Sequence, residues 1–264
     1  MARVFAVANQ KGGVAKTTTV QTLGAALAQL GERVLLVDLD PQACLTFAVG
    51  LDPDALKPTL HDVLIGRSKA QDAVLDTGSL SILPANIDLA GSEVHLLART
   101  GREHALGRAL APVRDDFDTV LIDCPPSLGV LTVNGLTASD QVLIPLQCEA
   151  LGHRGVAQLL DTVQDVREFT NPSLSVRGVI ATMFDTRVKH AHEVLDDVPS
   201  RFGITVLPPP VPKTVRFAEA PGRGHSILDH APSSNGAAAY REIAAALHAD
   251  IAGGPGTPSP EGTS

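Results

Sequence analysis

The chain has 264 residues, of which 44% are hydrophobic and 19% charged, and its formal net charge is −8. This composition suits a single packed domain, and no apolar run is long enough to cross a bilayer. Aromatic residues make up 3% and tryptophan is absent, which argues against a surface that stacks single-stranded nucleic acid. The acidic net charge excludes a generally basic surface, so any contact with DNA must come from a local basic patch.

The three cysteines, Cys44, Cys124 and Cys148, form no C-x-x-C pair. A disulfide framework or a metal knuckle is therefore not expected, and each cysteine is interpreted as a small buried apolar residue. No signal peptide is expected before the first apolar run, so the chain is predicted to be soluble and cytoplasmic.

Strands and helices alternate along the chain and predict one α/β domain with a mostly parallel, doubly wound sheet flanked by helices. Apolar runs predict strands at 3–8, 33–38, 79–83, 118–123, 141–146, 176–182 and 204–207. Helical periodicity predicts helices at 17–30, 61–65, 70–75, 89–111, 129–137, 152–168, 190–202 and 233–249. The domain is placed at 1–250, and the Gly-, Pro- and Ser-rich segment 251–264 is expected to be disordered.

The segment 9–18, which reads N-Q-K-G-G-V-A-K-T-T, lies between the first predicted strand and the first predicted helix. A strand, a glycine-containing loop and a helix in this order predict a phosphate-binding loop, whose backbone N–H groups and helix N-terminus bind phosphate oxygens. In such a loop Lys16 would lie along the terminal phosphates and Thr17 would hold Mg²⁺. A nucleoside triphosphate is the implied ligand.

The loop departs from the strict G-x-x-x-x-G-K-[ST] pattern at Gln10 and Ala15, and it carries a second lysine, Lys11. This K-G-G-x-x-K-[ST] arrangement resembles the deviant Walker A family of P-loop NTPases, which includes the ParA and Soj partition ATPases and MinD. Further segments fall where that family places them, and the last three resemble its ParA/Soj branch in particular. They read V-D-L-D-P-Q, I-D-C-P-P, T-M-F-D-T-R, V-P-K-T-V-R-F-A-E-A-P and D-H-A-P, at 37–42, 122–126, 182–187, 211–221 and 229–232.

The resemblance implies a nucleotide site, and each of its residues is carried over onto a matching position. Contacts with the phosphates fall on the loop residues Lys11, Gly12, Gly13, Val14, Ala15, Lys16, Thr17 and Thr18. Contacts with the base fall on Met183, Asp185 and Pro212, and the magnesium site falls on Thr17 and Asp123.

Three residues are implied as catalytic: Lys11, Lys16 and Asp40. In the family the extra lysine, here Lys11, reaches across a face-to-face dimer to the partner's nucleotide. The second aspartate of the D-x-D pair, here Asp40, positions the attacking water. Asp38 is ranked below Asp40, as a residue that mainly holds the phosphate loop.

Glycine stands at the position of Ala15 in Soj and MinD. A positive φ would strain an alanine there by about 1–2 kcal/mol. We therefore predict that this position has an ordinary negative φ.

Basic residues that contact DNA in Soj-like proteins match Arg187, Lys213 and Arg216. An alternative stays open, in which these side chains form salt bridges with nearby Asp185 and Glu219. Charge counting alone favours an ordinary solvated surface, and the resemblance favours DNA.

The resemblance implies a Mg²⁺-dependent ATPase that forms a sandwich homodimer on ATP and binds DNA without sequence preference. A ParB-like partner would stimulate hydrolysis, and the cycle would segregate a chromosome or plasmid over the nucleoid, without a membrane. The alternative is a MinD-like regulator of a membrane or protein cargo, which needs a basic amphipathic C-terminal helix. A third class, an electron-transfer or metal-carrier ATPase, would need paired cysteines at a dimer interface, and the spacing of Cys124 and Cys148 does not match it. A small-molecule ligase or synthetase on the same fold stays open as a further alternative.

Overall fold

The computed structural model describes residues 2–149, 152–220, 222 and 224–252. In this part of the chain seven strands form one sheet in the order β3-β4-β2-β5-β1-β6-β7. They are β1 (Arg3–Val7), β2 (Val34–Asp38), β3 (Leu75–Asp76), β4 (Ser81–Leu83), β5 (Thr119–Asp123), β6 (Gln141–Gln147) and β7 (Ser175–Thr182). All neighbouring strands are parallel except β3 and β4, which confirms the predicted fold class.

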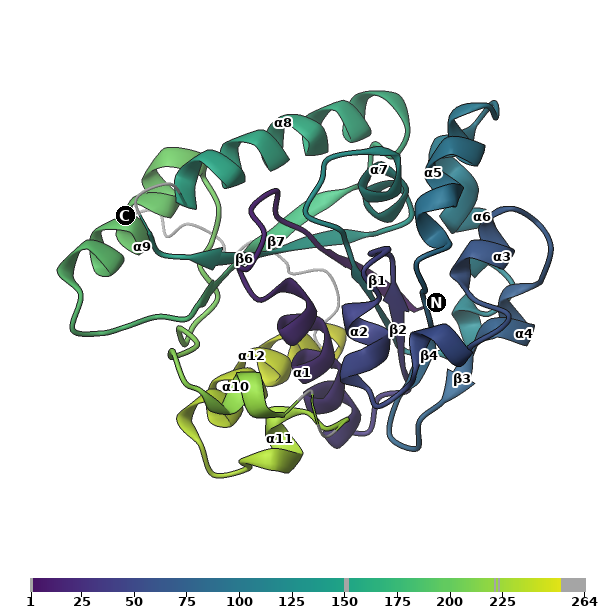
Figure 1. The fold of residues 1–264 in the computed structure, drawn as a ribbon. Coiled ribbons are helices and arrows are strands. Elements are labelled where there is room, and N and C mark those ends of the chain that lie inside the picture. Colours follow the sequence, from purple (N-terminus) through teal and green to yellow (C-terminus); the bar gives the residue numbers. More distant parts are fainter. Residues whose placement is uncertain (1, 150–151, 221, 223, 253–264) are drawn as a thin grey trace.

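Helices cover both faces of the sheet (Figure 1). One face is packed against α1 (Lys16–Gln29), α2 (Cys44–Ala48), α10 (Arg216–Glu219), α11 (Ile227–His230) and α12 (Asn235–Ala252). The other face is packed against α3 (Leu60–Leu64), α4 (Ala70–Ala73), α5 (Leu89–Leu97), α6 (Ala105–Leu110), α7 (Val130–Thr137), α8 (Gly152–Phe169) and α9 (Lys189–Phe202). Short 3₁₀ turns lie at Pro53–Ala55, Arg102–His104 and Arg114–Asp116.

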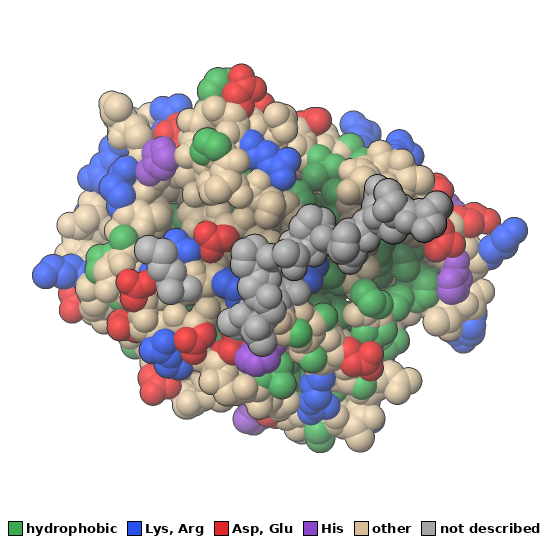
Figure 2. All heavy atoms as spheres, turned by 180° about the vertical axis from the view of Figure 1, so that it is seen from behind, with side chains coloured by type: hydrophobic (Ala, Val, Ile, Leu, Met, Phe, Trp, Pro, Cys, Tyr) green, Lys and Arg blue, Asp and Glu red, His purple; other side chains and the backbone are tan. Residues whose placement is uncertain are grey.

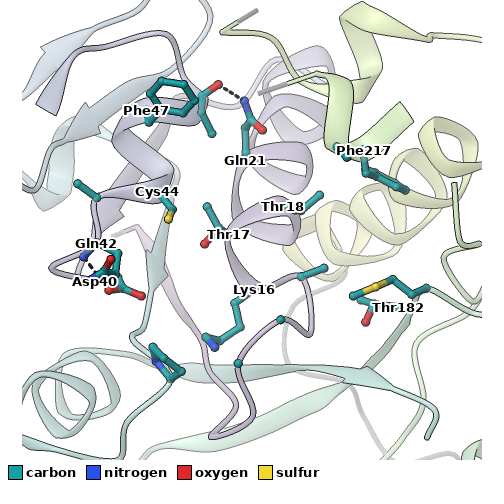
Figure 3. Close-up of a pocket in the computed structure, with 18 of the residues that line it drawn as sticks. Lys16, Thr17, Thr18, Gln21, Asp40, Gln42, Cys44, Phe47, Thr182 and Phe217 are labelled. Atoms are coloured by element: carbon teal, nitrogen blue, oxygen red, sulfur yellow. Dashed lines mark hydrogen bonds between the residues drawn. The ribbon is translucent and has the colours of Figure 1, made fainter. Parts of the chain in front are cut away.

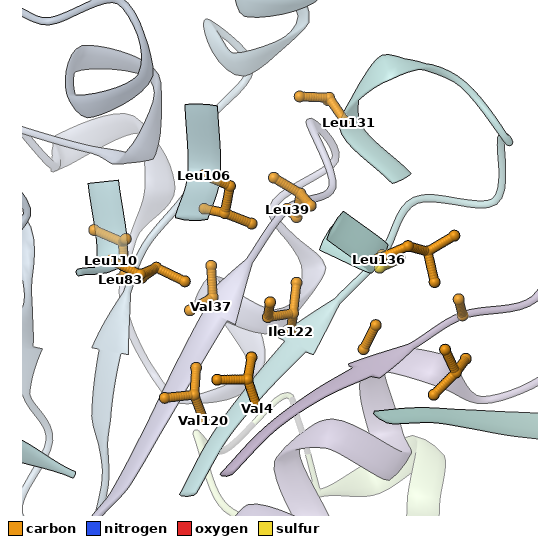
Figure 4. Close-up of a cluster of buried hydrophobic side chains, with 14 of the residues drawn as sticks. Val4, Val37, Leu39, Leu83, Leu106, Leu110, Val120, Ile122, Leu131 and Leu136 are labelled. Atoms are coloured by element: carbon orange, nitrogen blue, oxygen red, sulfur yellow. The ribbon is translucent and has the colours of Figure 1, made fainter. Parts of the chain in front are cut away.

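The central strands are buried on both faces, as their continuous Val, Leu and Ile runs predict. On β5, Val120 and Ile122 belong to the core under α3–α9, whereas Leu121 belongs to the core under α1 and α12. Figure 4 shows the first of these cores, with side chains of β1, β2 and β5 packed against α6 and α7. The strands are therefore packed on both faces, and a site can form at the edge of the sheet where the strands end.

The predicted helix 89–111 is wrong in its middle. α5 ends at Leu97, Gly101 has a left-handed φ of 65°, and a 3₁₀ turn leads into α6. A residue in this conformation ends a helix, and glycine adopts it without strain.

The predicted strand 204–207 is reduced to a single parallel bridge between Val179 and Val206. The prolines at 208–210 follow at once, and they have no N–H group with which to extend a ladder. The predicted helix 70–75 ends early, because the chain turns into the short antiparallel strand β3. The helices α2, α10 and α11 were not predicted, because they are too short to show helical periodicity.

α12 continues to Ala252, two residues into the segment that the sequence predicts to be disordered. The remainder of that segment, 253–264, lies outside the described residues. Among the described helices, none combines the length and the apolar character that a bilayer crossing requires.

Candidate functional site

The carboxyl ends of β1, β2 and β5 meet at one edge of the sheet. The strand register places Asp123 beside Val7 on one side and beside Asp38 on the other. A cavity of about 1000 Å³ opens at this edge, between the loop after β1, the segment after β2 and the chain that follows β7 (Figure 3). This is the place where open parallel sheets bind ligands.

The loop between β1 and α1 is fixed from behind by two neighbouring strands. The Asn9 side chain donates from Nδ2 to the Pro145 carbonyl of β6 at 2.7 Å and accepts from the Lys11 N–H at 3.0 Å. The Thr182 hydroxyl at the end of β7 donates to the Val14 carbonyl at 3.0 Å. Val14 is buried, so it supports the loop from the core side. The loop is shaped by the protein itself, with the N-terminus of α1 directed at the cavity.

Ala15 caps α1 with φ 65° and ψ 35°, so the prediction of a negative φ there is wrong. The turn into the helix requires the left-handed conformation, and this chain adopts it with an alanine at about 1–2 kcal/mol of strain. Ala43 and Met183 also have positive φ, and these three are the non-glycine residues with this conformation in the described chain. All three line the cavity.

Lys16 is the charged group of the loop that faces the cavity, where its ammonium points toward the side that carries Asp40 (Figure 3). Its Nζ lies 3.4 Å from the Lys11 carbonyl oxygen. Burial lowers the pKa of Lys16, and the nearby charge of Asp123 opposes that effect. A buried ammonium with one weak protein acceptor is a good partner for phosphate oxygens.

Thr17 and Asp123 form the predicted metal pair. The Thr17 hydroxyl donates to Asp123 Oδ2 at 2.6 Å, while Asp123 Oδ1 is buried and has no hydrogen-bond partner. Burial and the charge of Asp38 raise the pKa of Asp123 well above its ordinary value. Oxygen ligands with an unsatisfied buried carboxylate fit Mg²⁺, which coordinates one or two carboxylates together with phosphates and water. Among the described residues, no cluster of three or more His, Cys, Asp or Glu suited to a metal occurs.

Asp38 and Asp40 have different surroundings. Asp38 is fully buried, and its Oδ2 accepts from the N–H and the hydroxyl of Thr46 at 2.8 and 2.7 Å. Burial raises the pKa of Asp38 to about 6. Asp40 lines the cavity, and its Oδ1 accepts from the Gln42 N–H at 2.9 Å (Figure 3). Asp38 therefore ties β2 to α2, and Asp40 is the carboxylate that can reach a bound ligand.

Lys11 does not line the cavity that Lys16 lines. Its ammonium lies 2.7 Å from Glu149 Oε2, just beyond β6. The two lysines of the loop thus point in different directions, and one of them is directed away from the chain's own cavity.

Of the three residues predicted to contact the base, Met183 lines the cavity and the other two do not. Asp185 is bound by Arg187, and Pro212 forms a bridge with Phe184. The cavity instead has walls that were not predicted from the sequence, among them Gln21, Phe47, Phe217 and Tyr240. Gln21 lies one helical turn after Thr17 and could have been found from that spacing, but no local pattern marks the three aromatic residues.

The predicted DNA-binding arginines are held in ion pairs. Arg187 donates to both oxygens of Asp185 at 2.9 and 2.7 Å, and Arg216 donates to Glu219 at 3.1 Å. These contacts are the salt-bridge alternative to DNA binding, with Asp185 and Glu219 as the partners. Lys213 lines the cavity mouth. Figure 2 shows acidic and basic side chains mixed over the face seen from behind, with no continuous basic surface.

The chain matches known proteins over most of its length. A family model described as an AAA domain matches residues 2–176. The sporulation initiation inhibitor protein Soj of Bacillus subtilis is 43% identical over 246 residues, which cover 92% of this chain and 97% of Soj. The chain belongs to the ParA/Soj family of P-loop ATPases.

Two further matches bear on this ATPase. The chromosome partitioning protein ParA of Caulobacter vibrioides is 44% identical over 246 residues, 92% of each chain. A solved structure named cobyrinic acid a,c-diamide synthase from Mycobacterium smegmatis, with bound ADP and magnesium, is 54% identical, covers 96% of each chain and has a TM-score of 0.86. Family membership confirms the predicted ATPase activity, and the ligands of that structure agree with the predicted cofactors, ATP and Mg²⁺.

The strain at Ala15 generates a prediction. Ala15→Gly should raise the free energy of unfolding of the nucleotide-free protein by about 0.5–1 kcal/mol, because glycine adopts a positive φ without strain but gains entropy in the unfolded chain. Urea denaturation measures the change. Ala111→Gly is the matched control, since Ala111 is exposed with φ −50° and ψ −40°, and it should lower stability. A destabilised Ala15→Gly protein would contradict the account of the loop.

The raised pKa of Asp38 generates a second prediction. Its folded pKa of about 6 exceeds the unfolded value of about 3.9, so the wild type gains stability from this group as the pH falls from 6 toward 4. Asp38→Asn cannot titrate. Its stability relative to wild type should therefore be greater at about pH 7.5 than at about pH 5, by about 1 kcal/mol.

Urea denaturation at the two pH values measures this difference. Asp118→Asn is the control, because hydrogen bonds from Arg33 lower the pKa of Asp118 below its ordinary value. A lowered carboxylate pKa changes stability only as the pH falls below about 5, toward and past the unfolded value of about 3.9, so the stability of this variant relative to wild type should be nearly the same at the two pH values. If the stability of Asp38→Asn relative to wild type were the same at both pH values, burial would not raise the pKa of Asp38, and the account of this group would be wrong.

Proposed function

We propose that this ATPase works as a partition switch: it forms a sandwich dimer on ATP, the dimer binds DNA without sequence preference, and a ParB-like partner stimulates hydrolysis. The cycle would move a chromosome or plasmid over the nucleoid of a bacterial cytoplasm. The observation that carries this proposal is the divergence of the two loop lysines. Lys16 faces the chain's own cavity, whereas Lys11 lies outside it, paired with Glu149, and would reach a second copy once that pair is broken.

The rim of the cavity supports association of two copies face to face. Phe47, Ile87 and Val215 line the cavity and are 54%, 61% and 71% exposed. Large apolar side chains grouped around one opening are typical of an interface. A second copy placed on this rim would cover them and bring its Lys11 to the nucleotide.

The residues of the site support hydrolysis of the terminal phosphate. Lys16 and the N-terminus of α1 would bind and orient the phosphates, and Thr17 with Asp123 would hold Mg²⁺, which neutralises phosphate charge when bound. Asp40 would orient the attacking water from the opposite side of the cavity. Lys11 of the second copy would add a positive charge, so full activity would depend on the dimer.

DNA binding would rest on Arg187, Lys213 and Arg216. Arg187 and Arg216 are paired with carboxylates of the same chain. The positive charge that a single copy presents to DNA phosphates at these positions is therefore small. A dimer doubles the number of basic groups that can contact one duplex, and binding through phosphates falls steeply with salt.

The two other readings fit the chain less well. A MinD-like membrane contact needs a free amphipathic helix, but the apolar side of α12, with Tyr240, Ile243 and Leu247, is buried. The name of the Mycobacterium smegmatis structure suggests an amide-forming synthase. A thiol that releases ammonia from glutamine would need a low pKa, whereas burial raises the pKa of Cys44, of Cys124 and of Cys148.

The DNA switch is tested by duplex binding, with no nucleotide, with ADP and with a slowly hydrolysed ATP analogue, at two salt concentrations and with the mass in solution recorded. We expect salt-sensitive binding by a dimer with the ATP analogue only. Lys213→Glu with Arg216→Glu should weaken it about tenfold or more and lower the salt slope by about two per protomer. Arg33→Glu with Arg108→Glu changes the net charge equally and should have a small effect. A dimer that ignores DNA would favour a protein or membrane cargo instead.

Asp40→Ala tests the assignment of the water-positioning residue. We expect the variant to bind ATP and to accumulate as the ATP-bound dimer, while phosphate release falls by about 100-fold or more. Asp54→Ala is the control, because Asp54 is also a carboxylate that lines the cavity, and it should turn over normally. Normal turnover by Asp40→Ala would remove this residue from the mechanism.

A further inference from the structure

The ammonium of Lys11 has a defined partner outside the nucleotide cavity. Lys11 Nζ lies 2.7 Å from Glu149 Oε2, and the two side chains are 31% and 55% exposed. Among the described residues, Glu149 is the ion-pair partner of Lys11, the additional lysine of the loop motif. Glu149 was not anticipated from the sequence, since it lies far from the phosphate loop in the chain.

Both ends of this ion pair are fixed by neighbouring strands. On the lysine side, the Asn9 side chain binds the Lys11 N–H and the Pro145 carbonyl of β6. On the carboxylate side, Gln147 Nε2 donates to Glu149 Oε1 at 2.5 Å, which leaves Oε2 facing Lys11. The parallel pairing of β1 with β6 thus brings together the two segments that carry Lys11 and Glu149.

The charges around the pair keep Glu149 anionic. The hydrogen bond from Lys11 lowers the pKa of Glu149, and the positive charge of Lys213 adds to that effect. Gln147 is neutral and adds a hydrogen bond without competing for the lysine. The carboxylate therefore offers Lys11 a permanent counter-ion in the absence of phosphate.

We infer that Glu149 is a positioning residue for Lys11: it holds the ammonium outside the chain's own cavity and competes with the nucleotide phosphates of a second copy for it. This inference rests on the proposed dimer. When Lys11 moves to a phosphate of the second copy, its contact of 2.7 Å with Glu149 is broken. The free energy of that ion pair therefore reduces the free energy gained on dimerisation. Because both side chains are partly exposed, the pair is weak enough to be exchanged.

The test is the dissociation constant of the dimer, measured by sedimentation with a slowly hydrolysed ATP analogue. A dimer breaks two such pairs, so Glu149→Gln should lower the dissociation constant about fivefold at low salt. The gain should disappear at high salt, where exposed ion pairs are screened. Glu149→Asp keeps the charge and should stay close to wild type. The affinity of the monomer for ADP should be the same in wild type and in all variants. A general structural defect would change that affinity, so this measurement separates such a defect from the positioning role.

Asp118→Asn is the matched control, because it removes the carboxylate of an exposed ion pair with Arg33 at the opposite end of the sheet. It should leave the dissociation constant of the dimer unchanged. If the wild type dimerises and Glu149→Gln dimerises equally or less well, the positioning role is overturned while the proposed function stands. If neither protein dimerises with the ATP analogue, the proposed function fails and the role of Glu149 fails with it.

Discussion

Two carboxylates meet at the carboxyl edge of the sheet because β2 and β5 run parallel in a register that pairs Asp38 with Asp123. Both side chains are buried, and the nearest cation, Lys16, is itself buried. Charges of like sign in a low-dielectric environment destabilise the folded chain unless a cation or a proton joins them. As a pair of anions the two carboxylates therefore repel each other, and a cation held at Asp123 would relieve that repulsion.

A second constraint is the attachment of the phosphate loop to strands on its far side. Asn9 ties the loop to β6, and Thr182 ties it to β7. These contacts hold Lys16 in the cavity and place Lys11 beside Glu149. One short loop would thus serve two copies of the chain in the proposed dimer, because Lys16 lines the chain's own cavity and Lys11 does not.

The sequence predicts features that depend on neighbouring residues and misses those that depend on distant ones. Continuous Val, Leu and Ile runs identify the buried parallel strands, and the loop motif identifies Lys16 and Thr17, both of which line the cavity. The sign of φ at Ala15 was predicted wrongly. Alanine disfavours a positive φ, but contacts of the loop with β6 and β7 hold the backbone in that conformation, and the local sequence does not contain those contacts. The partners Glu149, Phe47 and Phe217 come from other elements, so no spacing within the chain marks them.

The central claim is that Thr17 and Asp123 form a preset magnesium site for ATP, and calorimetric titration of the nucleotide-free protein with ATP, with and without Mg²⁺, tests it most directly. Oδ1 of Asp123 is buried without a partner, so Mg²⁺ should tighten ATP binding to the wild type about tenfold or more. Asp123→Asn should lose that dependence while still binding ATP through Lys16 and the loop. Equal ATP affinity of the wild type with and without Mg²⁺ would contradict the account.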